Sequence, residues 1–185
     1  ELLYQLAMCI NYVHATRHTH QDLKPENVMF RTEPRKNQPV PQPVLIDFGL
    51  AKKRSLAEAQ LRSKKDRAMT IPYAGPERVR HMRSPEGTAV NYDYRQADVW
   101  AFGAIAYEIV NGRYVFESHT NANMSRTEME AVILNKQPDA MDAAVPTGVK
   151  NLIYAMLHTE ADRRPRMAQI VHYLETEIGV PPPRL

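Results

Sequence analysis

The pattern of hydrophobic and polar positions predicts a mainly helical protein. Apolar residues recur at steps of three and four between Glu1 and His14, which indicates a helix that buries one side. From Asp98 to Val110 nearly every position is apolar, and a helix that is apolar all round lies inside a domain. Gly112 is placed to end this inner helix. Three more helices are predicted: one from the capping box Ser125–Glu128, one over residues 148–158, and one from Pro165 to Ile178.

Two short apolar runs, Val28–Phe30 and Val44–Ile46, predict a pair of strands. The proline-rich residues 31–43 between them indicate a surface loop, so the strands are expected to form a hairpin with a long connection. Such a hairpin would bring Asn27 and Asp47 side by side at one end of the ribbon. A metal ion could bridge the two side chains there.

The stretch from residue 50 to residue 70 is polar and basic, and its sequence leaves three interpretations open. It is a solvated loop with a short helix over Leu56–Leu61, a regulatory segment that responds to phosphorylation, or a nuclear-localisation or nucleic-acid patch. Residues 70–77, which follow, are expected to be a rigid, turn-rich passage because they contain two prolines and a glycine.

Composition narrows the class of protein. The 185 residues suffice for one domain or one large lobe, and the 43% of hydrophobic residues can form a core. A net charge of +3 is too weak to predict nucleic-acid binding. The single cysteine, Cys9, favours a reducing compartment, so we expect a cytoplasmic location, with the nucleus also open. No apolar run is long enough to predict a membrane span.

The candidate chemistry lies in ten residues, His18 to Asn27, which read HTHQDLKPEN. Asp22 can accept a hydroxyl proton, Lys24 can neutralise a migrating phosphoryl group, and the amide oxygen of Asn27 can hold Mg²⁺. Twenty residues after Asn27, Asp47-Phe48-Gly49 offers a second metal carboxylate. The spacing therefore indicates a phosphotransferase site.

Other polar residues need an interpretation of their own. Asp98 stands at the start of the predicted inner helix and needs a buried partner, because an unpaired carboxylate there is costly. Its natural role is to hold backbone N–H groups of residues 18–27. His14, His18 and His20 could form a zinc site, but no cysteine or carboxylate joins them at ligand spacing. We interpret His20 as packing beneath the loop, and His14 and His18 as surface or helix-end residues.

Taken together, the motifs resemble those of the C-terminal lobe of a eukaryotic protein kinase, serine/threonine type. The resemblance covers nearly the whole chain and rests on five motifs in the family's order: His20–Asn27, Asp47–Gly49, Gly75–Glu77, Asp98–Gly103 and Arg164-Pro165. It implies a kinase C-lobe over residues 1–178, a helical bundle with a short β-hairpin at the catalytic cleft. The catalytic loop would be residues 18–27, the magnesium motif 47–49 and the activation segment 47–77. Residues 179–185 would be a proline-rich tail or linker.

The resemblance also implies what each motif residue does. Asp22 would orient or deprotonate a protein hydroxyl, and Lys24 would contact the phosphoryl group that ATP transfers. Asn27 and Asp47 would each hold Mg²⁺. Glu77 and Arg164 would form a structural ion pair, and Thr70 would belong to the loop that holds the protein substrate. Lys24 and Thr70 are similar to those of serine/threonine kinases, and the surrounding stretch looks most like the calcium- and calmodulin-regulated branch.

Two positions depart from the family pattern. Gln21 replaces an arginine that binds a phosphorylated activation loop, so we predict that activity does not depend on such a pairing. Replacing Ser55 or Ser63 with alanine is then expected to leave activity intact, whereas Thr70 would act through the geometry of the substrate loop. Gly75 replaces an alanine, which is a small change that adds backbone freedom.

The family's glycine-rich loop, strand lysine and partner-helix glutamate do not occur in this sequence. Because the chain also begins without Met, inside a predicted helix, we expect a fragment or a protein whose N-terminal lobe is absent here. The chain alone would hold half a nucleotide cleft and be nearly inactive, since phosphoryl transfer depends on positioning. The alternative function is an inactive kinase-like scaffold or binding module. The intact Asp22, Lys24, Asn27 and Asp47 favour the kinase.

Overall fold

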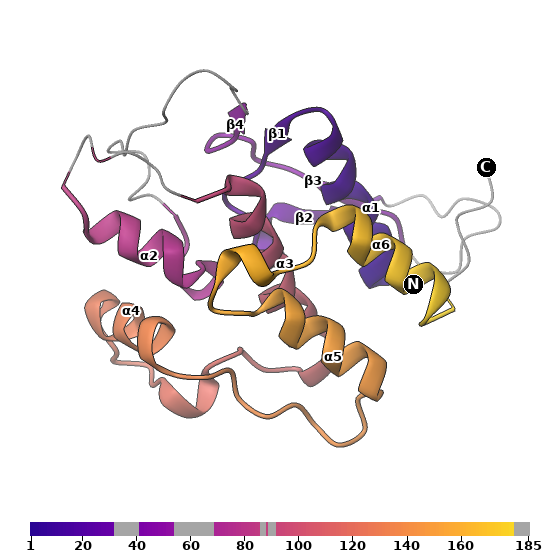
Figure 1. Cartoon of the computed structure of the whole chain (residues 1–185). Helices are drawn as coiled ribbons and strands as arrows, with labels where there is room; N and C mark the ends of the chain where they lie inside the picture. Colours follow the sequence, from indigo (N-terminus) through magenta and orange to yellow (C-terminus); the bar gives the residue numbers. More distant parts are fainter. Residues whose placement is uncertain (32–40, 54–68, 86–87, 89–91, 180–185) are drawn as a thin grey trace.

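The computed structural model describes residues 1–31, 41–53, 69–85, 88 and 92–179, and this part of the chain is mainly helical, as predicted (Figure 1). The helices are α1 (Leu2–Ala15), α2 (Pro76–Arg83), α3 (Tyr94–Asn111), α4 (Arg126–Asn135), α5 (Thr147–Met156) and α6 (Met167–Thr176). The strands are β1 (His18–Thr19), β2 (Val28–Phe30), β3 (Pro43–Leu45) and β4 (Lys52–Lys53). Short 3₁₀ turns are η1 (Pro25–Asn27), η3 (Ile71–Tyr73), η4 (Glu117–His119) and η5 (Ala161–Arg163).

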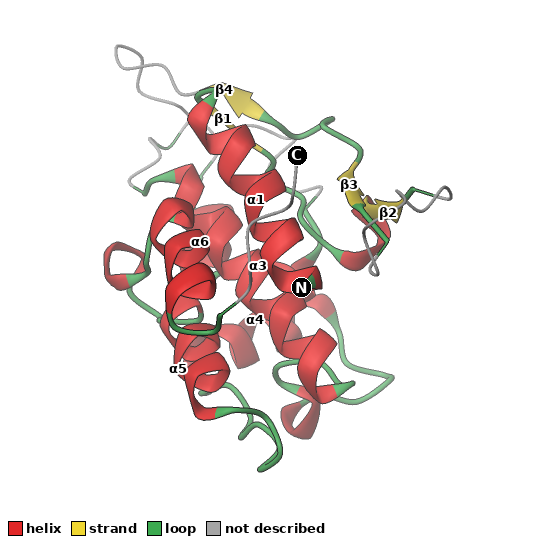
Figure 2. Cartoon of the chain, turned by 90° about the vertical axis from the view of Figure 1, so that its right-hand side faces the viewer, coloured by secondary structure: helices red, strands yellow, loops and turns green. Residues whose placement is uncertain are grey.

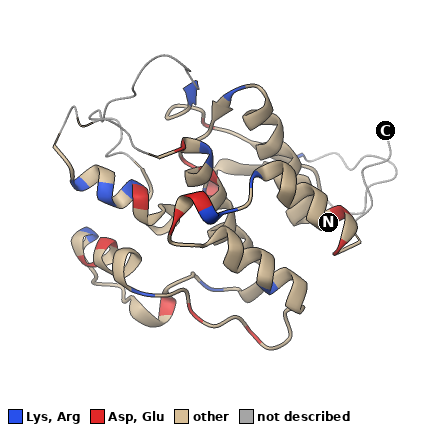
Figure 3. Cartoon of the chain, in the orientation of Figure 1, with Lys and Arg blue, Asp and Glu red and all other residues tan. Residues whose placement is uncertain are grey.

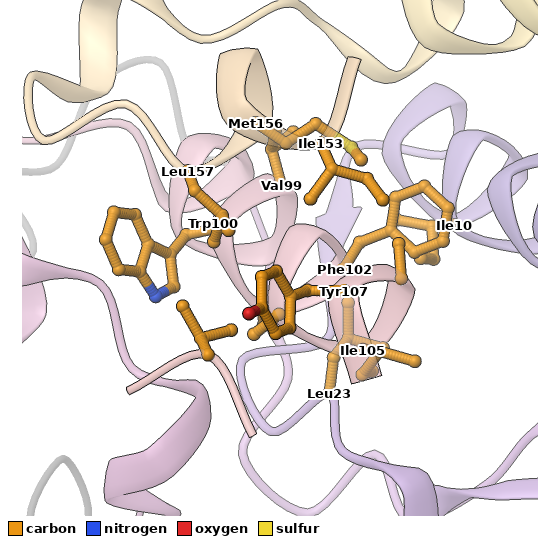
Figure 4. Packing of buried hydrophobic residues seen from close by; sticks show 14 of the residues in the cluster. Ile10, Leu23, Val99, Trp100, Phe102, Ile105, Tyr107, Ile153, Met156 and Leu157 are labelled. Atoms are coloured by element: carbon orange, nitrogen blue, oxygen red, sulfur yellow. The ribbon is translucent and has the colours of Figure 1, made fainter. Parts of the chain in front are cut away.

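Helix α3 lies at the centre of the helices (Figure 1). It is buried on all sides from Gln96 to Tyr107, as its apolar sequence predicts, whereas Ile109 in its last turn is 44% exposed. Its aromatic residues pack against α1 and α5, where Ile10 and Ile153 join the same core (Figure 4). Helices α3 and α5 lie close together at Gly103, where an added Cβ would lie 2.9 Å from the Cβ of Met156. A larger residue would therefore push α3 and α5 apart.

The start of α3 differs from the prediction. The helix begins at Tyr94, with Asp93 as its N-cap, because the Asp93 carboxylate accepts a hydrogen bond from the backbone N–H of Arg95. Asp98 consequently lies in the second turn of the helix, and not at its beginning. The predicted end is confirmed, since Gly112 adopts the left-handed conformation with φ 67°.

The predicted hairpin is confirmed. β2 pairs antiparallel with β3, with Val28 opposite Leu45, and the backbone N–H of Ile46 donates to the carbonyl of Asn27 at 3.0 Å. A second antiparallel pair, β1 with β4, was not predicted, because strands of two residues are too short to show an alternating pattern. Figure 2 shows the two pairs apart, with β1 and β4 above α1 and with β2 and β3 to the right of the helices.

Several other predictions need an outcome. The helix at α4 is confirmed, with Ser125 and Glu128 forming the capping box. The last helix begins at Met167, because Arg166 is the N-cap and its backbone N–H is satisfied by the Gln169 side chain. The turn-rich passage 70–77 contains η3 and the start of α2. The predicted helix over residues 56–61, most of the loop 31–43 and residues 180–185 lie outside the described residues.

Within the described residues, no helix combines the length and the apolar character that crossing a bilayer requires.

Candidate active site

The loop over residues 18–27 is fixed by one carboxylate of α3. Asp98, which is 1% exposed, accepts hydrogen bonds from the backbone N–H of His20 at 2.8 Å and of Gln21 at 2.8 Å. Its Oδ2 also lies 2.9 Å from Nε2 of His14. These bonds satisfy a buried charge, which would otherwise be unfavourable. The core helix therefore sets the course of the loop that follows α1.

In the part of the chain that the structure describes, no group of three or more His, Cys, Asp or Glu side chains is placed to hold a metal ion. His14 was predicted to be a surface or helix-end residue, and it lies in the last turn of α1, where its side chain is 8% exposed and is held by Asp98. His20 is fully buried beneath the loop, where its Nε2 lies 2.9 Å from the carbonyl of Ile46 and its ring packs 4.7 Å from that of Phe48. Since Ile46 and Phe48 flank Asp47, this contact joins the loop to the second predicted metal residue.

The Asp22 carboxylate pairs with a cation and accepts a hydrogen bond from a hydroxyl. Its Oδ2 lies 3.0 Å from Nζ of Lys24, and its Oδ1 accepts a hydrogen bond from the hydroxyl of Thr70 at 3.0 Å. Lys24 also donates to the Thr70 hydroxyl at 3.1 Å, so the three side chains form a closed triangle. Burial raises the pKa of the Asp22 carboxyl, but the Lys24 ammonium and the Thr70 hydroxyl outweigh burial and lower the pKa below its ordinary value.

Asn27 connects Asp22 to the hairpin. Its side-chain amide donates to the carbonyl of Asp22 at 2.8 Å and to Oδ2 of the same residue at 3.2 Å. The Asn27 backbone pairs with Ile46, so Asp47 is the next residue beyond this pair. Asp47 is exposed, has a left-handed backbone with φ 58°, and accepts a hydrogen bond from the N–H of Gly49 at 3.1 Å. The hairpin thus carries both predicted metal residues at the same end.

A buried ion pair connects α2 to the turn η5. Arg164 binds both carboxylate oxygens of Glu77 at 2.7 Å, and it also donates to the carbonyls of His158 at 2.7 Å and Gln96 at 2.8 Å. Its guanidinium lies 4.9 Å above the ring of Trp100. Such a bidentate pair fixes the orientation of both partners.

Gly75 is part of the same arrangement, because it leaves the room that the Glu77 carboxylate occupies. A Cβ at residue 75 would lie 2.7 Å from each carboxylate oxygen of Glu77. An alanine at this position would therefore require a shift, but only of the far end of the flexible Glu77 side chain, which agrees with the expectation that the change is small.

The sequence analysis did not identify some residues that lie near the site. The hydroxyl of Tyr73 donates to Glu108 of α3 at 2.8 Å, and burial together with this carboxylate raises the pKa of Tyr73. Arg78 on α2 is buried and donates to the carbonyl of Gln21. Figure 3 shows that α2 carries both basic and acidic positions. This mixture of charges is typical of a helix face that is exposed to solvent, so the sequence alone does not predict that Arg78 points inward.

Comparison with known proteins shows which protein family the chain resembles. The family described as the protein kinase domain matches residues 1–174. The chain is similar to an Aurora kinase of Candida glabrata, with 30% identity over 88% of this chain and 38% of the relative. It is also similar to MAP kinase-activated protein kinase 2 of Drosophila melanogaster, with 27% identity over 92% of this chain and 44% of the relative. For calcium-dependent protein kinase 6 of Plasmodium berghei the identity is 26%, over 93% of this chain and 10% of the relative. The chain thus spans from a tenth to under half of the length of these relatives.

Proposed function

Because this chain belongs to the protein kinase family, we propose that it carries the catalytic loop of a serine/threonine kinase, which transfers the γ-phosphate of ATP to a protein hydroxyl. The observation that carries the proposal is the triangle of Asp22, Lys24 and Thr70, with Asn27 bonded to the same Asp22. A scaffold would have no need to hold a carboxylate that accepts a proton, a cation and an amide oxygen that can bind a metal ion at one point. The finer assignment to the calcium- and calmodulin-regulated branch stays a prediction.

The oxygen atoms at the end of the hairpin fit a magnesium ion. Because Asn27 turns its amide nitrogen toward Asp22, its Oδ1 is left for a cation, and the exposed Asp47 carboxylate lies just beyond the paired position. Carboxylate and amide oxygens are the ligands that Mg²⁺ takes in nucleotide sites. In this proposal Asn27 and Asp47 hold the ion, and ATP with Mg²⁺ supplies the phosphoryl group and neutralises part of its charge.

The side chains of the loop then have distinct tasks. Asp22, whose pKa is lowered, is ionised at neutral pH and accepts a hydrogen bond from the substrate hydroxyl, which it orients toward the phosphorus. Lys24 places a positive charge beside Asp22, where it can neutralise the migrating phosphoryl group. Thr70 holds both side chains at their spacing. Rate in such a site comes mainly from positioning and electrostatics.

The experiment compares three variants in the full-length product of the gene that encodes this chain. Labelled ATP and Mg²⁺ are supplied with a general protein substrate, and transfer is measured for the parent, Asp22→Asn and Asp47→Asn. We expect Asp22→Asn to lower kcat by about 10² to 10⁴-fold, and Asp47→Asn to remove the magnesium-dependent signal. The control is Asp162→Asn, since Asp162 is an exposed carboxylate on η5.

The outcomes separate the two functions. Loss of transfer in Asp22→Asn and Asp47→Asn, with parental transfer in Asp162→Asn and unchanged melting temperatures, supports the kinase. Equal signal in all four proteins refutes it and leaves the inactive scaffold as the better account. A parent that binds ATP without transferring phosphate leads to the same conclusion.

A further inference from the structure

Arg78 is a buried cation for which the proposed mechanism has no use. It lies in the first turn of α2 and is 8% exposed. Within the described residues its one hydrogen bond runs from Nη1 to the carbonyl oxygen of Gln21 at 2.5 Å, and no carboxylate of this part of the chain pairs with it. Burying a guanidinium is unfavourable unless an ion pair or hydrogen bonds compensate for the lost water. The position of its acceptor shows where those bonds matter.

The acceptor belongs to the peptide group that joins Gln21 to Asp22. Arg78 donates to the oxygen of this group. The backbone N–H of Asp22, at the other end of the group, donates to Nδ1 of His20, with 3.3 Å between the two nitrogens. The peptide plane is thus held at both ends by side chains. Because the plane sets the direction in which the next residue leaves the backbone, it helps set where the Asp22 carboxylate points.

Gln21 needs this support, since its backbone is left-handed with φ 69°, a conformation that residues other than glycine rarely adopt. Its N–H donates to Asp98 at 2.8 Å, and its side-chain amide donates to the carbonyl of Tyr94 at 2.8 Å. Both of these bonds hold Gln21 against α3. Arg78 binds the carbonyl of the same residue from α2, so an unfavourable conformation is held by two separate helices.

We propose that Arg78 is a positioning residue for phosphoryl transfer: its guanidinium fixes the peptide between Gln21 and Asp22 and thereby aims the Asp22 carboxylate. The inference rests on the proposed role of Asp22.

The place of Arg78 also couples the catalytic loop to the segment that precedes α2. Consecutive residues of a helix point about 100° apart, so Glu77 turns to Arg164 while Arg78 turns to Gln21. Thr70, earlier in that segment, contacts Asp22 directly. A shift of α2 would therefore reach Asp22 by two routes, through Thr70 and through Arg78.

The test uses the full-length gene product with Arg78→Met, which keeps the length but removes the charge and the donors, and Arg78→Lys, which keeps the charge. Arg80→Met is the matched control, because Arg80 is an exposed arginine on the same helix. We expect Arg78→Met to lower kcat roughly 10- to 100-fold, with KM for ATP within about threefold. The Asp22 carboxylate would be misplaced, while the residues that contact the nucleotide would keep their positions. Arg78→Lys should recover part of the loss, and Arg80→Met should match the parent.

A second readout does not depend on activity. Amide hydrogen exchange over residues 20–22 is measured by mass spectrometry, with α6 as the internal reference. We expect faster exchange in Arg78→Met at residues 20–22 and unchanged exchange in α6. A kcat within twofold of the parent, or a loss that disappears once kcat is divided by the folded fraction, overturns the proposal.

If the parent and Arg80→Met transfer no phosphate, the proposed function fails and the role of Arg78 in phosphoryl transfer fails with it, and the exchange measurement then tests only whether Arg78 holds the peptide between Gln21 and Asp22. Faster exchange at residues 20–22 in Arg78→Met supports this holding role, and unchanged exchange overturns it.

Discussion

Replacing Arg164 with methionine should destabilise the fold more than any surface substitution near it. The side chain of Arg164 is fully buried and that of Glu77 is 9% exposed, so the change leaves a carboxylate without its partner. It also removes the donors that satisfy the carbonyls of His158 and Gln96. Removing one partner of a buried pair costs about 3–5 kcal/mol, because the remaining charge stays buried and unpaired.

This energy corresponds to a change of roughly 10² to 10³·⁵ in the unfolding equilibrium, since about 1.4 kcal/mol equals one factor of ten. For a chain of this size, 1 kcal/mol shifts the melting temperature by about 2–4 °C, so a fall of roughly 6–20 °C is expected. A domain whose stability is about 5–15 kcal/mol would lose a large share of it.

Urea unfolding followed by tryptophan fluorescence measures the effect directly. Trp100 is the only tryptophan of the 185 residues, is 1% exposed, and packs beneath the Arg164 guanidinium at 4.9 Å. The control is Arg163→Met, because Arg163 pairs with Glu160 at 2.8 Å while both side chains are more than 60% exposed, at 67% and 63%. An exposed pair contributes about 1 kcal/mol or less. If Arg164→Met unfolds within about 1 kcal/mol of Arg163→Met, the reasoning from burial is refuted.

Three further predictions concern the site and the core. Thr70→Val should lower kcat about 10-fold or more, because the hydroxyl that bonds Lys24 and Asp22 is lost; steady-state kinetics measure it. Gly103→Ala should destabilise the fold by about 1–3 kcal/mol in urea unfolding, because the new Cβ would lie 2.9 Å from that of Met156. The folded-state pKa of Asp22 is below its ordinary value of 3.8, so its ionised form stabilises the fold above pH 3.8, and this contribution is lost as pH falls through the lower pKa. Asp22→Asn should therefore show a flatter loss of stability with acid below pH 3.8, measured by urea midpoints.

Each of these predictions has a matched comparison. Thr70→Ser keeps the hydroxyl and should stay near the parent; equal kcat in the valine and serine variants would contradict the hydrogen-bond argument. Gly148→Ala meets only the tip of Ile178 at 3.0 Å and the Tyr173 hydroxyl at 3.4 Å, so it should be milder than Gly103→Ala. Parallel acid profiles for the parent and Asp22→Asn would show that the Asp22 carboxyl is not the group responsible.

The sequence predicted the parts of the fold whose signals are local. The helical stripe of α1, the apolar run of α3 and the capping box of α4 each follow from one stretch of residues. The start of α3 was missed because Tyr94–Ala97 mixes polar and apolar residues, and only the Asp93 cap marks the boundary. Strands β1 and β4 were missed because each is two residues long.

For the candidate site, the sequence predicted only which residues lie close together along the chain. The spacing of Asp22, Lys24 and Asn27 places them in one loop, but their partners come from distant segments. That Arg78 turns inward, and that His14 is buried against Asp98, depends on how α2 and α1 pack against α3. Helical periodicity shows which face is apolar, and it does not show which polar side chain finds a partner inside.

The bonds of the loop over residues 18–27 run mostly to residues far along the chain, and this bears on how the polypeptide could be divided. If the backbone were cleaved between residues 53 and 69, the bonds that Asp98, Arg78 and Thr70 make to the loop would all join one piece to the other. The α1–α6 packing would join them as well. The two polypeptides should therefore reassociate without a covalent link, which would make that interval a place to split the protein into complementing halves for a reconstitution reporter.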